Sequence, residues 1–362
     1  MKKQYLFLAI FFYIITVLYL ANITPITPHE AKKFYTSADL VSVLMHWGDL
    51  LFEGFIGLRF FFILLGFLSI YLFYELSRRY FLKRTDAYLA TAIFMFLPGI
   101  ITASTLANVA ILVLPLVLFF VLMYERGSFL VLPFVMLVLF FIHEASIIFF
   151  VALLIYSFVH KDKKLGILSS AFLIAFIYLV KGIEIGGRPS GHFIEIFGLY
   201  ASIFSPLLFI YFFYAMYRIL LREKKVLLWY ISFTALAFSL ILSIRQRVYI
   251  TDFAPYVMMA IILMLDVYNH SIRVRLPQFQ KRYKQAYYVI IVFLAISVSL
   301  IVFHKVTYLL MNDESNHFAK RIYEPYFLAK KLKIEEKSCY KGLKERERYQ
   351  LLYYGITSCD NN

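Results

Sequence analysis

Long apolar runs follow one another from the start of the sequence to about residue 303, with short polar segments between them. Within the runs the apolar residues are continuous and do not alternate with polar ones, which indicates helices. About 20 apolar helical residues are needed to cross the hydrocarbon core of a bilayer, so the pattern predicts an all-α polytopic membrane protein. Eleven membrane-spanning helices are expected, near residues 4–23, 58–76, 87–103, 107–124, 128–142, 145–159, 165–181, 194–218, 226–244, 253–268 and 286–303.

The apolar stretch from 128 to 159 decides the predicted topology, because only His143-Glu144 interrupts it. As a single helix, it would put the basic segments 218–225 and 273–284 on the outer side of the membrane. Cytoplasmic loops are normally the basic ones, and two short helices that meet at His143-Glu144 satisfy this rule. We therefore expect a multi-pass protein of the bacterial inner membrane with its N-terminus in the cytoplasm and its C-terminus outside.

Composition and charge agree with this organisation. The 362 residues are 62% hydrophobic and 16% charged, with a formal net charge of +15. In a soluble protein such a charge would favour nucleic acid as a partner, but here the basic residues lie mainly in the loops expected inside, and no nucleic acid is predicted. We divide the chain into a transmembrane domain, residues 1–303, which includes a first outer loop at 24–57, and an extracytoplasmic C-terminal segment, residues 304–362.

Both cysteines of the chain, Cys339 and Cys359, lie in this C-terminal segment. Outside the cytoplasm two such residues are expected to form one disulfide, which would stabilise the loop between them by about 3 kcal/mol in the chain-entropy model. The alternative is two unpaired thiols in a cytoplasmic tail, which would require the reverse topology.

The first outer loop contains a motif that has two interpretations. Thr27-Pro28-His29-Glu30 has the features of a helix start, with a capping threonine, a proline at the first helical position and a glutamate that completes a capping box. Phe34, Ala38, Val41 and Leu44 or Met45 would then share one face of an amphipathic helix at the membrane surface. Glu30 is either a structural capping residue or a carboxylate that faces a cavity at membrane level.

Several motifs in the chain resemble those of the C-type glycosyltransferase superfamily, in particular the branch of protein O-mannosyltransferases and lipid A aminoarabinose transferases. Those proteins show a Pro-Asp-Glu-Ala motif after the first span, and this chain has Pro28-His29-Glu30-Ala31 there. The other matching segments keep the family order: Gly57-Leu58-Arg59, Gly66, Tyr71–Arg79, Pro98, Gly187-Arg188, Ser205-Pro206 and Arg245-Gln246-Arg247-Val248-Tyr249. The similarity extends from residue 20 to about residue 310.

This resemblance implies a transfer reaction in which a carboxylate removes the proton from an acceptor hydroxyl while the hydroxyl attacks the anomeric carbon of a sugar. A cation must hold the leaving phosphate. The sequence departs from the family at two acidic positions, because His29 replaces the leading Asp and Asn108 stands where a second Asp usually opens the fourth span. Glu30 is therefore the predicted base, with His29 beside it.

Other residues of the outer face are predicted to support this chemistry. His143 and Glu144 would line a polar cavity as a further base or a cation-holding pair, or would simply be an exposed helix end. Arg245 and Arg247, with Tyr249 next to them, are expected to bind a lipid-linked phosphate through the planar guanidinium group, and Arg59 and Arg188 are added to this substrate-binding set. No metal site is predicted and no resident cofactor is implied, although a divalent metal is left open.

The resulting hypothesis is an inner-membrane glycosyltransferase that takes a sugar from a polyprenyl-phosphate donor and passes it to a lipid, glycan or protein acceptor on the outer face. We also weigh two alternatives. One is a polysaccharide polymerase of the Wzy or EpsG type, which the segment Phe141-Ile142-His143-Glu144-Ala145-Ser146 resembles somewhat. The other is a non-catalytic membrane protein on a transferase-derived scaffold, which the two lost acidic positions favour.

Overall fold

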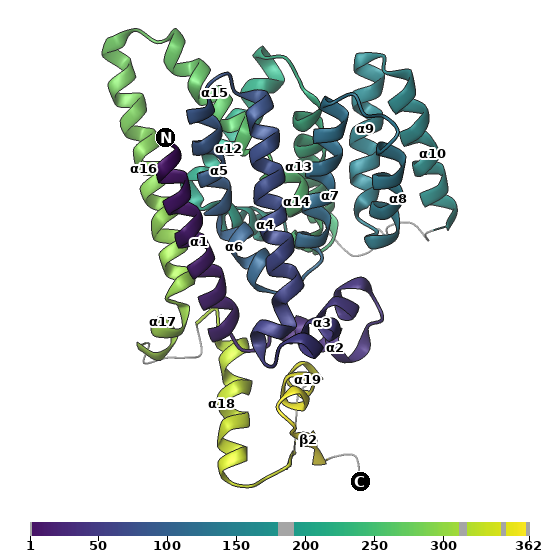
Figure 1. Cartoon of the computed structure of the whole chain (residues 1–362), viewed down its shortest axis with the longest axis vertical. Helices are drawn as coiled ribbons and strands as arrows, with labels where there is room; N and C mark the ends of the chain where they lie inside the picture. Colours follow the sequence, from purple (N-terminus) through teal and green to yellow (C-terminus); the bar gives the residue numbers. More distant parts are fainter. Residues whose placement is uncertain (1, 180–191, 311–316, 342–344, 360–362) are drawn as a thin grey trace. The chain divides into compact units, whose positions relative to one another are not determined.

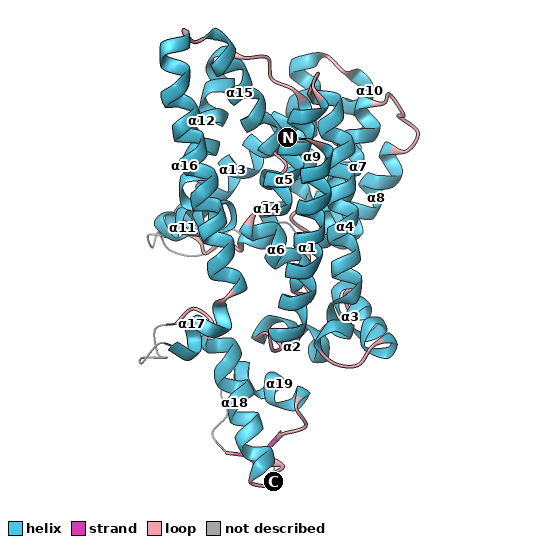
Figure 2. Cartoon of the chain, turned by 60° about the vertical axis from the view of Figure 1, so that its left-hand side comes forward, coloured by secondary structure: helices cyan, strands magenta, loops and turns pink. Residues whose placement is uncertain are grey.

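The computed structural model describes residues 2–179, 192–310, 317–341 and 345–359 and is helical almost throughout (Figures 1 and 2). It divides into two compact units. Unit 1 comprises Met1–Tyr13, Leu65–Ala103 and Val109–Val298, and unit 2 comprises Ile14–Leu64, Ser104–Asn108 and Ser299–Asn362. The expected division at residue 303 is close to the last of these boundaries, but the first outer loop belongs to unit 2.

Most of the helices belong to unit 1. They are α5 (Arg84–Met95), α6 (Pro98–Thr105), whose last residues belong to unit 2, α7 (Ala110–Glu125), α8 (Leu132–Ile142), α9 (Ser146–His160), α10 (Lys163–Leu179), α11 (His192–Phe204), α12 (Pro206–Arg222), α13 (Leu227–Arg245), α14 (Ile250–Met258), α15 (Ile261–Val274) and α16 (Pro277–Val302), whose last residues also belong to unit 2. Two further helices, α1 (Lys3–Ile23) and α4 (Phe55–Tyr80), contribute to both units.

The protein is an all-α polytopic membrane protein, and each predicted span coincides with a helix or with a bent pair of helices. Among the described residues, α1, α4, α13 and α16 are each long and apolar enough to cross a bilayer, and three bent pairs raise this number to seven. α7, α8 and α9 are apolar but shorter, and α10 coincides with a predicted span, so the count of eleven stays a prediction.

The spans expected at 87–103, 194–218 and 253–268 are bent pairs of helices and not continuous helices. α5 and α6 meet at 59°, α14 and α15 at 42°, and α11 and α12 at 106°. At the sharpest of these bends, Ser205 has a φ of 81° and Pro206 begins α12. Proline has no N–H to continue a helical hydrogen-bond ladder, so the run of apolar residues goes on while the helix direction changes.

The core of unit 1 surrounds α7, which is buried on nearly every side. Phe120 of α7 packs edge-on against Phe149 of α9, with ring centroids 5.0 Å apart, and Phe149 stacks on Tyr256 of α14. A helix that is apolar all round belongs inside a bundle, so the lack of an amphipathic pattern in 107–124 is explained by its central position. The predicted break at His143-Glu144 is confirmed, since α8 ends at Ile142 and α9 begins at Ser146.

In unit 2 the first outer loop forms two helices, α2 (Pro28–Thr36) and α3 (Leu40–Leu51), where the sequence pattern predicted one. The break lies at Ser37–Asp39, because the Asp39 side chain accepts a hydrogen bond from the Ser42 amide and caps a new helix. Val41 and Met45, two residues of the predicted apolar face, are buried.

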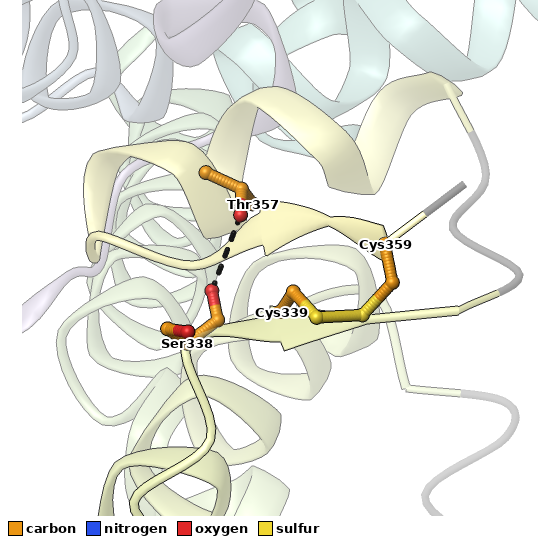
Figure 3. Close-up of a disulfide and its surroundings, with 4 residues drawn as sticks. All are labelled: Ser338, Cys339, Thr357 and Cys359. Atoms are coloured by element: carbon orange, nitrogen blue, oxygen red, sulfur yellow. Dashed lines mark hydrogen bonds between the residues drawn. A yellow bond between two sulfur atoms is a disulfide. The ribbon is translucent and has the colours of Figure 1, made fainter. Parts of the chain in front are cut away.

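The C-terminal part of unit 2 contains α17 (His304–Leu310), α18 (Lys320–Ile334) and α19 (Glu345–Tyr353), with two short strands, β1 (Cys339–Tyr340) and β2 (Thr357–Ser358), paired in parallel. Ala329, Leu332, Leu351 and Ile356 form a small apolar core. The predicted disulfide between Cys339 and Cys359 is confirmed, and the Thr357 hydroxyl beside it donates to the Ser338 carbonyl (Figure 3).

Candidate functional site

The best-defined polar site in unit 2 is built around Glu30 at the start of α2. Thr27 has extended backbone angles and its side chain accepts a hydrogen bond from the Glu30 amide, while the Glu30 carboxylate accepts one from the Thr27 amide at 2.9 Å. Pro28 occupies the first turn, where no amide hydrogen is needed. The predicted capping box is therefore confirmed, and it fixes the direction of the Glu30 side chain.

Arg59 of α4 lies within hydrogen-bonding distance of this carboxylate and is fully buried. Its Nε donates to Glu30 Oε1 at 2.9 Å and its Nη2 donates to Glu30 Oε2 at 2.8 Å. The remaining guanidinium hydrogens reach the backbone carbonyls of Ala21, Thr24 and Pro25. Arg59 thus ties the end of α1 to the starts of α2 and α4, and none of its contacts leaves room for a substrate phosphate.

Two glycines allow α4 to begin next to α3. A Cβ atom on Gly57 would lie 1.7 Å from the Phe52 carbonyl oxygen, and one on Gly48 would lie 2.2 Å from the Gly57 carbonyl oxygen. Only glycine fits such a close approach of two backbones. The glycine of the Gly57-Leu58-Arg59 motif therefore has a steric purpose, which is to bring Arg59 to its place.

A third segment completes the surroundings of Glu30. The Ala107 amide donates to Glu30 Oε1 at 2.8 Å, so each carboxylate oxygen accepts two hydrogen bonds. Burial by itself raises the pKa of Glu30, but the positive charge and hydrogen bonds of Arg59 and the amides of Ala107 and Thr27 together hold that pKa below its ordinary value. Glu30 is thus a buried, ionised carboxylate whose hydrogen-bonding positions are all occupied.

Three segments of the first half of the chain therefore meet in unit 2: the start of α2, the start of α4 and the residues that follow α6. Asn108, which stands at the position of the family's second Asp, is next to Ala107 and is half-buried, with its amide donating to the Leu106 carbonyl. His29, at the position of the leading Asp, is exposed in the first turn of α2. His29 and Asn108, the two positions where the chain departs from the motifs it resembles, are thus next in sequence to Glu30 and Ala107, whose side chain and amide are joined by a hydrogen bond.

In unit 1, His143 is not paired with the neighbouring Glu144. His143 ends α8, and its Nε2 lies 3.3 Å from Oδ1 of Asp252 in α14, without the geometry of a hydrogen bond. Glu144 is exposed. Asp252 was not among the site residues predicted from the sequence. The sequence feature that could have pointed to Asp252 is its position as the acidic residue in the first turn of α14.

The arginines of the predicted phosphate-binding set differ in their surroundings. Arg247 donates two hydrogen bonds to Oε1 of Glu195 in α11, at 2.9 Å and 2.5 Å, and this pair is solvent-exposed. Arg245 ends α13, is exposed and has no acidic partner among the described residues. Tyr249 is 73% exposed, and Arg188 lies outside the described residues. Of the arginines of this set that the structure describes, Arg245 is therefore the one whose charge is available to an anion.

No group of three or more His, Cys, Asp or Glu side chains that could hold a metal ion is present in the described part of the chain. The charged contacts that matter for the candidate site are the Glu30–Arg59 pair, the His143–Asp252 contact and the arginines after α13.

In comparisons with known proteins, no family model and no curated protein matches this sequence. Two solved structures of ArnT from Cupriavidus metallidurans do match it. The apo structure has a TM-score of 0.59 and 15% sequence identity, covering 98% of this chain and 85% of that chain. The structure bound to undecaprenyl phosphate has a TM-score of 0.61 and 12% identity, covering 100% of this chain and 87% of that chain. The chain therefore shares the overall fold of ArnT, an aminoarabinose transferase of the branch that its motif order resembles.

Proposed function

We propose that this protein is a membrane glycosyltransferase that moves a sugar from a polyprenyl-phosphate donor to a lipid, glycan or protein acceptor on the outer face of a bacterial inner membrane. The observation that carries the proposal is the likeness to ArnT over essentially the whole chain, because one of the two ArnT structures holds undecaprenyl phosphate. The disulfide agrees with an oxidising compartment for residues 304–362.

In the proposed reaction an acceptor hydroxyl attacks the anomeric carbon, a new bond forms from the acceptor oxygen to this carbon, and the bond from the carbon to the phosphate oxygen breaks. The hydroxyl proton passes to a base on the protein, and polyprenyl phosphate leaves. Exposed Arg245 is the proposed ligand of the leaving phosphate, with Tyr249 close to it along the chain. Arg188, which lies outside the described residues, stays a proposed phosphate ligand on the sequence alone. Arg247 would contribute only if it exchanged Glu195 for the donor.

We choose the proposed base by asking which side chain could accept a proton without first losing an ion pair. Glu30 would have to lose its ion pair with Arg59 before it could accept a proton, so we propose that Glu30 and Arg59 shape the first outer loop. His29 is then the proposed base of this motif, since an imidazole titrates near neutral pH and replaces the family's carboxylate. His143, with Asp252 beside it, is the second proposed base.

A non-catalytic membrane protein on the same scaffold is the second candidate. Two observations favour it: the carboxylates of the family are absent at His29 and Asn108, and the remaining Glu30 has all its acceptor positions occupied. A Wzy- or EpsG-type polymerase has no comparable support in the contacts described here.

Sugar transfer in membranes that contain the full chain tests the proposal. The donors are a mixture of radiolabelled polyprenyl-phosphate sugars, native membranes supply acceptors, and both donor breakdown and labelled product are measured. Wild type is expected to consume a donor, and Arg245→Ala and His29→Gln are expected to lose most of this turnover, while Lys224→Ala, an exposed basic residue of the opposite predicted face, retains it. Absence of donor breakdown by well-folded wild type with every donor would favour the non-catalytic candidate.

A further inference from the structure

A well-formed cavity of unit 1 lies between the ends of α12 and α15, two helices that run side by side (Figure 2). Its volume is about 420 Å³. These helix ends carry the basic segments 218–225 and 273–284, so the positive-inside rule predicts that the cavity faces the cytoplasm, the side opposite the proposed transfer reaction.

Three arginines line this cavity: Arg218, Arg222 and Arg275. Arg218 is held in place, because its Nε lies 3.1 Å from Oε1 of Glu223 and its Nη1 donates to the Ser271 hydroxyl. That ion pair neutralises one positive charge, and it also fixes the position of a hydroxyl and a guanidinium at the cavity wall. Arg218 and Ser271 therefore form a fixed polar end of the cavity.

The other two arginines leave the cavity positively charged. Arg222 and Arg275 are exposed, and neither has an acidic partner within the described ranges. Arg275 lies over the ring of Tyr283, with its guanidinium carbon 4.3 Å from the ring centroid, which orients its planar donor edge without neutralising the charge. Two unneutralised guanidinium groups at one opening suit a phosphate group, which their planar forks bind through paired hydrogen bonds.

The apolar side of the same opening points to a lipid and not to a free ion. Tyr214, Tyr217 and Leu221 line the cavity and are exposed. They continue along α12 as a stripe with Ile210 and Phe213, which are also exposed, at the spacing of one helix face. A free phosphate would make no contact with this apolar surface. The acyl chains of a lipid would cover it while the headgroup reaches the arginines.

We propose that this cavity is a binding site for the phosphate headgroup of an anionic phospholipid, with Arg222 and Arg275 as the headgroup ligands and the exposed stripe of α12 as the acyl-chain surface. Basic pockets between helices on the cytoplasmic side are suited to such headgroups. The site is independent of the transfer reaction proposed above. Its role is to hold a lipid where α12 and α15 end, and so to fix these two helices relative to the bilayer.

The test is native mass spectrometry of the purified full chain in detergent, titrated with phosphatidylglycerol. The double variant Arg222→Gln/Arg275→Gln removes both headgroup ligands from exposed positions and is expected to weaken phosphatidylglycerol binding about tenfold or more, because each lost charged hydrogen bond costs at least several-fold. Lys281→Gln/Arg282→Gln is the matched control, since it removes two exposed charges from the same basic segment without touching the cavity, and it is expected to bind as wild type does.

Three results would overturn the proposal. One is equal weakening by the control variant, which would mean a general attraction of basic loops for anionic lipid. Another is equally tight binding of phosphatidylcholine to the wild type, because the arginines would then not select an anionic headgroup. The third is displacement of phosphatidylglycerol by inorganic phosphate at matched concentration, which would make the cavity a site for the free ion.

Discussion

Arg59 and Glu30 form a buried two-pronged ion pair, with Nε 2.9 Å from Oε1 and Nη2 2.8 Å from Oε2. The two side chains are 0% and 1% exposed. Two backbone amides complete the coordination of the carboxylate and three backbone carbonyls complete that of the guanidinium. The pair is therefore the polar centre that holds the first outer loop against the start of α4, within unit 2.

Removing one partner of this pair is expected to destabilise the protein strongly. Arg59→Met would leave the Glu30 carboxylate buried without its counter-charge, which costs about 3–5 kcal/mol in comparable buried pairs. Thermal unfolding of the detergent-solubilised protein is the measurement, and the midpoint is expected to fall by several degrees. Arg247→Met is the control, because Arg247 forms a solvent-exposed pair with Glu195 and exposed pairs contribute little. Equal shifts for the two variants would contradict a special role for the buried pair.

Glu30→Gln/Arg59→Gln separates structure from catalysis at this pair. Two amides can keep hydrogen bonds with the surrounding amides and carbonyls and leave no buried charge, so this double variant is expected to be more stable than Arg59→Met. If it recovers stability and also transfers sugar, Glu30 is not the base. Recovered stability with no transfer would instead return the proton-accepting role to Glu30 and contradict our assignment of a structural role.

Gly57→Ala is expected to lower stability because the new methyl group would collide with the Phe52 carbonyl oxygen, 1.7 Å from the ideal Cβ position. Overpacking of this kind costs about 1–3 kcal/mol or more when backbone atoms must move. The matched control is Gly198→Ala in α11, where a Cβ atom would have no heavy atom within 4 Å. Unfolding midpoints of the two variants decide the point, and a Gly57→Ala protein as stable as wild type would show that α3 and α4 can separate at no cost.

Part of the site around Glu30 could be predicted from the sequence, and part could not. The capping box at Thr27 and Glu30 was predictable, since its contacts are three residues apart and its residue types are specific. The ion pair with Arg59 could not be predicted, because Glu30 and Arg59 are 29 residues apart in the sequence. It also requires the close contact of Gly57 with the Phe52 carbonyl, which the periodicity of apolar residues does not reveal. The break at Ser37–Asp39 was missed for a related reason: the apolar spacing continues across it, while the Asp39 cap ends one helix and begins another.

The predicted phosphate-binding arginines illustrate a second limit. Arg245 and Arg247 are equivalent in sequence terms, both basic and both after an apolar run, yet only Arg247 is paired with Glu195. That pairing joins residues 52 apart in the sequence, and hydropathy carries no information about which charged side chains of two helices meet.

Loss of the disulfide is expected to loosen the C-terminal segment locally. The small core of Ala329, Leu332, Leu351 and Ile356 has few apolar residues, so the Cys339–Cys359 bond supplies a large part of its stability, about 3 kcal/mol for a loop of this size. Cys339→Ser/Cys359→Ser should raise hydrogen exchange in α19 and β2 and leave α7 unchanged. A reducing agent should reproduce this effect in wild type and add nothing in the double variant; unchanged exchange in α19 would contradict the prediction.

Asp252→Asn is expected to reduce sugar transfer more than Glu144→Gln, if His143 takes part in the proposed reaction. Asp252 lies 3.3 Å from the His143 imidazole and can orient the ring, whereas Glu144 is exposed. Initial rates at saturating donor are the measurement, with a loss of about tenfold or more expected for Asp252→Asn, in line with the contribution of a positioned proton acceptor. A greater loss with Glu144→Gln would favour the pairing that the sequence suggested.

His304 should make the stability of unit 2 depend on pH between about 5.5 and 7.5. Its Nδ1 donates to the Ile301 carbonyl at 2.8 Å, so the neutral ring accepts at Nε2 from the Tyr323 hydroxyl at 3.0 Å. Burial lowers the pKa of His304, and the nearby positive groups of His317, Arg59 and Lys305 lower it further. Protonation would therefore remove an acceptor and place a charge in a buried, already positive environment.

The sign follows from the protons bound in each state. In the unfolded chain His304 takes up a proton near its ordinary pKa of about 6.5, whereas the folded protein takes it up only at lower pH, so unfolding is favoured as pH falls below about 6.5. Glu30 adds nothing in this range, because its own contribution is lost only below its unfolded pKa of about 4.3.

Wild type should therefore lose stability from pH 7.5 to 5.5 more steeply than His304→Gln, by up to about 1.4 kcal/mol for each pH unit. Unfolding midpoints across this pH range measure the two slopes, and His160→Gln is the control for an exposed histidine. Identical slopes in wild type and His304→Gln would show that His304 is protonated as easily in the folded protein as in the unfolded chain.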